Sequence, residues 1–145
     1  MKIRFLQFVI SILVISSLPI VTNAESLDIP DNWSIESSTI YNEKLEKIGE
    51  FLDVEWFPYN SGQEFIDSFK KGFPDDPVGT KFISSGSSNR VYWVCRLGEY
   101  EDGKGGAGIW YSRFFWVKSA LIVFYSYKSC QDNFEGLLKI AQTLK

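Results

Sequence analysis

Histidine is absent from this chain of 145 residues, and cysteine occurs only twice. Without histidine, neither a Ser-His-Asp triad nor a Cys-His pair can be assembled, and no metal site can use imidazole ligands. Catalysis by paired carboxylates stays open in principle, and Asp53 and Glu55 are the best pair because alternation along a strand places them on one face. A solvated strand face explains the same two residues. We therefore expect no catalytic site, no metal site and no cofactor.

Clusters of positive charge are also missing. The chain has 15 Lys and Arg residues against 18 Asp and Glu residues, which gives a formal charge of −3. Removing Lys2 and Arg4 with a cleaved leader would leave 13 basic and 18 acidic residues, a formal charge of −5. An acidic chain without a basic run is a poor candidate for nucleic-acid binding. A protein partner with a basic surface suits it better.

The first 24 residues have the layout of a secretory signal peptide. Lys2 and Arg4 precede an apolar stretch from Phe5 to Val21, and Thr22–Ala24 offers small residues for cleavage. An uncleaved membrane anchor is the alternative, but an apolar stretch of about 17 residues is at the lower limit for spanning a bilayer. We expect cleavage, no membrane span in the mature domain of residues 25–145, and a periplasmic or secreted location.

The two cysteines, Cys95 and Cys130, both lie in the expected mature domain. An oxidising compartment favours a structural disulfide between them. This bond would close a loop of about 36 residues and contribute roughly 3–4 kcal/mol. Two free buried thiols and a redox pair are the alternatives, although the spacing is unlike C-x-x-C.

Hydrophobic periodicity predicts an α+β fold, with a mainly antiparallel sheet flanked by two helices. One helix begins at Ser61, where Glu64 completes a capping box, and ends near Gly72. The second follows Asp132, a plausible N-cap, and carries apolar residues at helical spacing up to Leu144. Strand patterns occur at residues 33–40, 50–57, 78–84, 91–98, 109–117 and 121–127, with a turn at 85–89.

A polar, glycine-rich loop is predicted from Glu99 to Gly108. Residues 103–108 match G-x-G-x-x-G, but a strand pattern follows instead of the helix that a dinucleotide site requires, so a hairpin loop explains the glycines. The loop opens with three acidic residues and one tyrosine, and exposed loops of this kind often carry function. An ordinary hairpin has the same composition. The candidate partner-binding residues are Glu99, Tyr100, Glu101 and Asp102, with Trp110 at the rim.

Aromatic side chains are concentrated in the strand from Trp110 to Val117, where both faces carry them. One face must pack against a helix. The other is either covered core, a protein interface, or a platform for a carbohydrate or lipid.

The two ends of the expected mature chain resemble a known family. The segment Ser26–Ile35 contains an apolar residue followed by Pro-x-x-Trp and resembles the opening strand of PsbP-like and DcrB-like domains. The segments Leu121–Lys128 and Ile140–Lys145 are similar to the last strand and helix of that family. The resemblance covers about 35 residues and implies a helix-flanked antiparallel sheet, which serves several functions.

Together these features predict an exported, non-enzymatic binding protein. Its specific form would be an immunity or inhibitor protein that neutralises a toxin or cell-wall hydrolase by direct contact. The alternative is an envelope accessory or ligand-binding domain that uses the aromatic sheet face.

Overall fold

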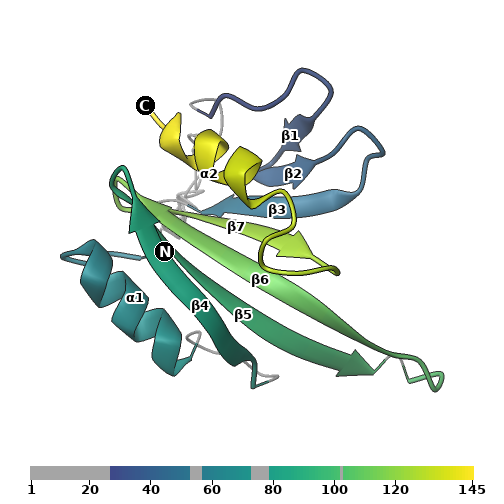
Figure 1. Cartoon of the computed structure of the whole chain (residues 1–145). Helices are drawn as coiled ribbons and strands as arrows, with labels where there is room; N and C mark the ends of the chain where they lie inside the picture. Colours follow the sequence, from purple (N-terminus) through teal and green to yellow (C-terminus); the bar gives the residue numbers. More distant parts are fainter. Residues whose placement is uncertain (1–26, 53–56, 73–78, 102) are drawn as a thin grey trace, which may run out of the picture.

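The fold is seen in a computed structural model, which describes residues 27–52, 57–72, 79–101 and 103–145 (Figure 1). The expected signal peptide, the Asp53 and Glu55 pair and Asp102 lie outside these residues. The elements in chain order are β1 (Ser34–Glu36), β2 (Thr39–Tyr41), β3 (Lys47–Leu52), α1 (Gly62–Lys71), β4 (Lys81–Ser88), β5 (Val91–Glu101), β6 (Ala107–Val117), β7 (Ala120–Ser126) and α2 (Phe134–Gln142).

The strands form one seven-stranded sheet in the order β1-β2-β3-β7-β6-β5-β4. Every neighbouring pair is antiparallel, which confirms the predicted α+β class. The pairing of β3 with β7 joins the first three strands to the later four, and it places Gly49 opposite Phe124. A Cβ atom at Gly49 would lie 2.8 Å from the Phe124 ring, so this junction requires glycine.

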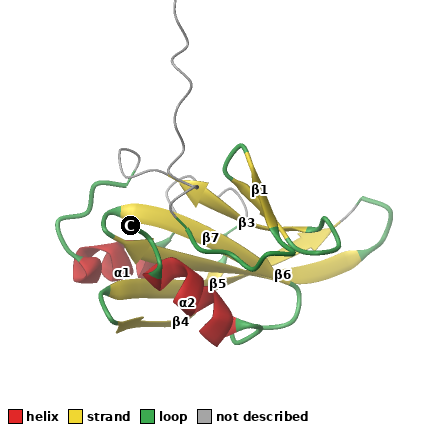
Figure 2. Ribbon diagram, turned by 90° about the horizontal axis from the view of Figure 1, so that it is seen from above, coloured by secondary structure: helices red, strands yellow, loops and turns green. Residues whose placement is uncertain are grey.

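The two helices cover opposite faces of the sheet (Figure 2). Successive side chains of a strand point to opposite faces. In β6, Phe114 and Trp116 therefore pack in the cluster that contains α1, while Phe115 and Val117 pack in the cluster that contains α2. All four side chains are buried. The aromatic strand is thus the shared centre of two cores.

At the start of α1, one of the two hydrogen bonds of the predicted capping box is present, and the other is displaced by one residue. The amide N–H of Glu64 donates to Ser61 Oγ over 3.1 Å. The Glu64 carboxylate accepts from the amide N–H of Asn60 over 2.8 Å, one residue before the cap. These bonds satisfy donors that a helix start otherwise leaves unpaired.

The end of α1 is held by Arg96, a buried residue of β5. Its Nη1 donates to the carbonyl oxygens of Phe69 at 2.7 Å and Lys70 at 3.1 Å. Its Nε donates to Thr80 Oγ1 at 2.7 Å, and Nη2 donates to the Thr80 carbonyl. One guanidinium therefore joins the last turn of α1 to the segment that enters β4.

The start of α2 differs from the prediction. The N-cap is Asn133, in the left-handed region with φ 53°, rather than Asp132. The Asp132 carboxylate instead accepts from Ser126 Oγ over 2.7 Å, and its carbonyl accepts from Arg113. Asp132 is therefore used to fasten the end of β7 to the segment before α2.

A disulfide joins Cys95 of β5 to Cys130, four residues before α2, as predicted. It ties the chain ahead of the helix to β5, the strand next to the edge strand β4. The bond is compatible with an extracellular or periplasmic location. Within the described residues, neither helix has the length and apolar character needed to span a membrane.

The strand boundaries correct several predictions. The serine-rich segment expected to turn at residues 85–89 continues β4 to Ser88, and the turn is Asn89-Arg90. The extended segment predicted at 33–40 is two strands separated by Ser37 and Ser38, both with positive φ. In each case cross-strand pairing, which composition does not encode, decides where the chain turns.

A candidate protein-binding arm

The hairpin of β5 and β6 extends beyond the rest of the sheet (Figure 1). β4 begins at Lys81, opposite Leu97, and β7 ends at Ser126, opposite Tyr111. Beyond these positions, and among the residues that the structure describes, β5 and β6 pair only with each other. We call this part, residues 98–110, the arm. A two-stranded ribbon with open edges needs support from its own side chains.

Two aromatic rings supply this support on one face of the arm. Gly98 pairs with Trp110, and a Cβ atom at Gly98 would overlap the indole ring. Gly108 pairs with Tyr100, and a Cβ atom at Gly108 would overlap the phenol ring. The two rings lie 6.1 Å apart between centroids. Each ring therefore covers the backbone of a glycine on the neighbouring strand and contacts the other ring.

The indole of Trp110 makes a hydrogen bond in addition to its contact with the Tyr100 ring. Trp110 Nε1 donates to Ser112 Oγ over 3.1 Å, where the arm joins the body of the sheet. Trp110 is half-buried, whereas Tyr100, nearer the loop, has 44% of its surface exposed. Of the two rings, Trp110 is therefore fixed where the arm joins the sheet, and Tyr100 is exposed nearer the loop.

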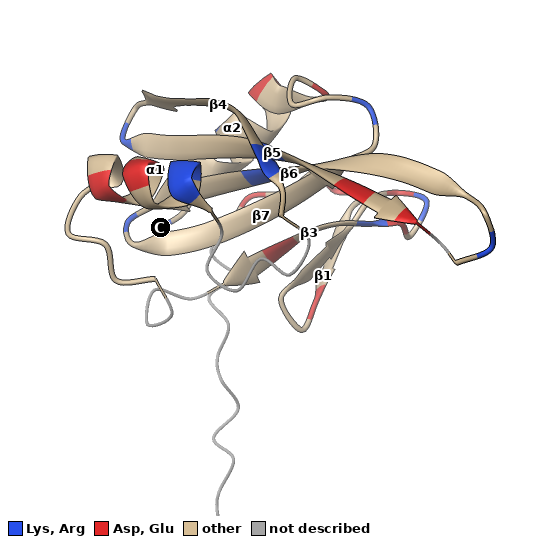
Figure 3. Cartoon of the chain, turned by 90° about the horizontal axis from the view of Figure 1, so that it is seen from below, with Lys and Arg blue, Asp and Glu red and all other residues tan. Residues whose placement is uncertain are grey.

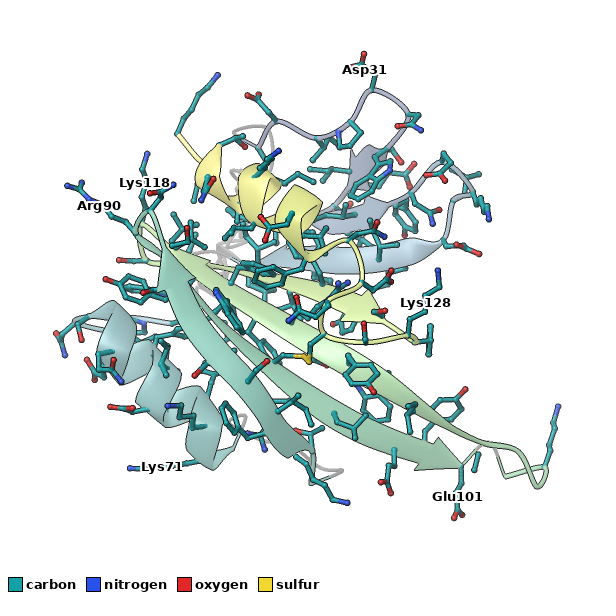
Figure 4. The ribbon with its side chains drawn as sticks, in the orientation of Figure 1. Asp31, Lys71, Arg90, Glu101, Lys118 and Lys128 are labelled. Carbon is teal, nitrogen blue, oxygen red and sulfur yellow. A yellow bond between two sulfur atoms is a disulfide. The ribbon has the colours of Figure 1, made fainter. Side chains whose placement is uncertain are left out.

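The other face of the arm carries carboxylates and an apolar side chain. Glu99 pairs with Ile109, and Glu101 pairs with Ala107. Glu99, Glu101 and Ile109 are all exposed. Figure 3 shows acidic residues at the end of β5 and a basic residue in the loop beyond it, and Figure 4 shows Glu101 at the far end of the strand. Glu99 Oε1 lies 3.5 Å from Lys81 Nζ. This ion pair is exposed and therefore contributes little to stability.

The predicted partner-binding residues that are described all lie on the arm, but on two faces. Tyr100 and Trp110 share the aromatic face, and Glu99 and Glu101 share the opposite one. The prediction that these residues form a loop is wrong, because Glu99, Tyr100 and Glu101 belong to β5. The ring-over-glycine contacts extend the ladder through residues that have low intrinsic strand propensity.

The glycine motif is a hairpin connection, as its context predicted. Gly103 and Gly105 have φ of 69° and 87°, which favour glycine. β6 starts at Ala107, so the last two residues of the motif already belong to a strand. The arrangement lacks the helix N-terminus that receives a pyrophosphate in a dinucleotide site.

Sequence reasoning missed the role of Gly98 and Gly108 in the arm. A glycine inside a strand pattern signals a close approach of another group, and this signal was present at both positions. Which group approaches each glycine depends on the aromatic residue that pairs with it on the neighbouring strand. That register follows from the length of the loop, which composition did not define.

The aromatic sheet face proposed as a ligand platform is largely core. Phe114, Phe115 and Trp116 have between 0% and 7% of their surface exposed, beneath the helices. Burial also raises the pKa of Tyr125 in β7 to about 12, with a smaller contribution from Glu50. The exposed aromatic side chains of the described residues are Phe82 in β4, Tyr100 in the arm and Tyr127 after β7.

The described side chains of the arm include two carboxylates, two aromatic rings and one exposed isoleucine. Among the described residues, His, Cys, Asp and Glu side chains form no cluster of three that could hold a metal ion. In comparisons with known proteins, no family model, no curated protein and no solved structure matches this chain. The resemblance of its ends to PsbP-like and DcrB-like domains stays a prediction.

Proposed function

We propose that this chain is an exported protein that binds another protein through the arm, as an immunity or inhibitor protein acting on a toxin or cell-wall hydrolase. The observation that carries the proposal is the projection of the arm beyond the sheet, with both edges unpaired among the described residues. A narrow ribbon of this kind can enter a cleft that a flat sheet face cannot reach.

The chemistry of the arm indicates which partner it would fit. Glu99 and Glu101 present carboxylates beside the exposed Ile109, so a basic rim around an apolar contact would complement this face. Tyr100 on the other face offers a large aromatic surface with few rotatable bonds. The net negative charge of the chain would speed encounter with a cationic enzyme.

The decisive variant removes the arm and keeps the sheet. Replacing residues 98–110 with Asn-Gly links Leu97 to Tyr111 through a two-residue turn. These two residues form the last pair that lies level with β4 and β7. We expect this variant to keep its circular dichroism spectrum. Binding to the partner purified with the full chain from its native host, and inhibition of that partner, should both be lost.

Charge reversal provides a finer test in the intact arm. Glu99→Lys together with Glu101→Lys should slow association with the partner, and the effect should shrink as salt is raised. Glu135→Lys, an exposed carboxylate on α2, is the matched control. If the trimmed chain inhibits the partner as well as the full chain does, the arm is not the binding site.

A further inference from the structure

A second concave region lies beside α2 and the end of β7, near the position where the arm joins the sheet. It is a groove of about 880 Å³ between the connection from β2 to β3, the end of β7 and the first turns of α2. Pro30, Trp33, Ile48, Leu137 and Ile140 supply its apolar wall. Figure 4 shows Lys128 beside the segment that leads from β7 towards α2. The volume is within the range of small-molecule sites.

Gly136 lies on the groove side of α2 and has no packing role within the described chain. It is the third residue of the helix, and a Cβ atom there would have nothing within 4 Å. Glycine is a poor helix former, so alanine would be favoured at this position if only folding mattered. Because Gly136 has no side chain, the helix backbone at this position is open to the groove.

The N-terminus of α2 also lacks the usual side-chain cap. Asn133 forms no capping hydrogen bond, and its Nδ2 faces the Asp132 carboxylate at 3.4 Å. The first amide groups of a helix are donors that attract anions, and the helix dipole adds to this attraction. Asn133 and Gly136 both line the groove, so this helix end borders the open space.

Arg113 places a buried cation in the lining of the same groove. Only 4% of its surface is exposed, and Nη2 donates to the Tyr125 carbonyl over 2.8 Å. Its Nε is buried without a hydrogen-bond partner in the described part of the chain. Burial lowers the pKa of Arg113 to about 10, against the opposing effect of Asp132, so the group is charged at neutral pH.

The lining of the groove carries four basic side chains, those of Lys44, Lys47, Arg113 and Lys128, against three acidic ones, those of Glu43, Glu46 and Asp132. Among the described residues, Lys44 and Lys128 form no salt bridge. The carboxylate of Glu46 accepts from Asn42 Nδ2 over 2.8 Å, and that of Asp132 accepts from Ser126. Both donors are neutral, so Glu46 and Asp132 oppose an anion in the groove as Glu43 does, and Lys47 is paired with Glu50 outside the lining.

We propose that this groove binds a small organic anion, a carboxylate or phosphate attached to an aromatic or apolar body. The charged group would sit at the first turn of α2, beside Gly136 and above Arg113, within reach of the lysines at the rim. The body would lie against Trp33 and the apolar side chains of α2. This site is separate from the arm and does not depend on the function proposed for it.

The test is a titration of the full chain, labelled with nitrogen-15, with phenyl phosphate. Inorganic phosphate and benzyl alcohol, each carrying half of the proposed chemistry, are titrated in parallel. We expect saturable shifts of the Gly136 amide and its neighbours with phenyl phosphate. Inorganic phosphate and benzyl alcohol should each bind at least about tenfold more weakly. Lys44→Gln and Lys128→Gln should each weaken binding by about three- to fivefold.

Gly136→Ala separates binding from folding. The added methyl group fills the space before the helix and should abolish the saturable shifts, while the melting temperature rises because alanine favours the helix. Lys139→Gln changes an exposed lysine of α2 outside the groove and should leave binding unchanged. The proposal is overturned if phenyl phosphate gives no saturable shift, if Gly136→Ala binds as well as the original chain, or if either half-probe binds as tightly as phenyl phosphate.

Discussion

The indole ring of Trp110 covers the backbone of Gly98 on the neighbouring strand, so the root of the arm has no room for a side chain at position 98. We expect Gly98→Ala to displace the ring and to cost about 1–3 kcal/mol in the free energy of unfolding. Urea unfolding followed by tryptophan fluorescence would measure this change. Gly72→Ala, where a Cβ atom meets nothing within 4 Å, is the control. Equal stability of the two variants would contradict the close contact.

The disulfide between Cys95 and Cys130 spans 35 residues of chain. Replacing both with alanine should lower the free energy of unfolding by roughly 3–4 kcal/mol, because the unfolded chain regains the freedom that the cross-link removes. The loss should be local as well as global. Hydrogen exchange in α2 should speed up more than in α1, since the bond holds the segment that precedes α2. Equal acceleration in the two helices would argue against that local role.

Arg96 satisfies carbonyl groups at the end of α1 that lysine cannot reach together. Arg96→Lys keeps the charge but loses the planar set of donors, and we expect a loss of about 2–3 kcal/mol. Chemical denaturation measures the loss, with Arg90→Lys, at a turn, as the control. A mild effect at position 96, equal to that of the control, would mean that α1 ends without help from β5.

The turn between β4 and β5 holds two residues in the left-handed region, Asn89 with φ 48° and Arg90 with φ 66°. Such turns prefer Asn-Gly, because a side chain at the second position is strained. Arg90→Gly should therefore raise the free energy of unfolding by about 1 kcal/mol, measured by thermal melting. Arg90→Ala removes the same charge without relieving the strain, so it should give no gain.

Tyr125 connects stability to alkaline pH. Burial, with a smaller contribution from Glu50, raises its pKa from 10.0 to about 12, so the folded protein retains the phenolic proton at a pH where the unfolded chain loses it. The contribution is complete below pH 10 and is lost as the pH rises towards 12. Tyr125→Phe removes this titration and keeps the ring. The stability of the original chain should therefore fall relative to that of Tyr125→Phe over this interval, as measured by urea unfolding at several pH values.

The parts of the fold that sequence analysis predicted correctly are those with a local cause. The bond from the Glu64 amide to Ser61 depends on residues three apart, and the apolar spacing of α2 is a property of one helix. The pairing of Cys95 with Cys130 required only that two cysteines share an oxidising compartment. The turn near Ser85 was predicted wrongly because serine and glycine favour turns. Pairing with β5 overrides this preference and keeps these residues in the edge strand β4.

The arm shows the same division. Its acidic and aromatic residues were identified from the sequence as candidates, because polar residues beside glycines mark an exposed hairpin. Their division between two faces could not be predicted, since one step in register moves every side chain to the opposite face. The groove at α2 was missed entirely, because its lining comes from segments that are distant in the chain.

Local periodicity and composition were therefore enough to indicate an antiparallel sheet, two helices and the cysteine pair. Each of these depends on contacts within a few residues or on a choice among very few partners. The tertiary structure decided which face each helix covers, how far β5 and β6 extend beyond their neighbours, and which aromatic ring meets which glycine. These outcomes depend on burial and on strand register, which are set by contacts between distant segments of the chain. No short stretch of sequence determines them.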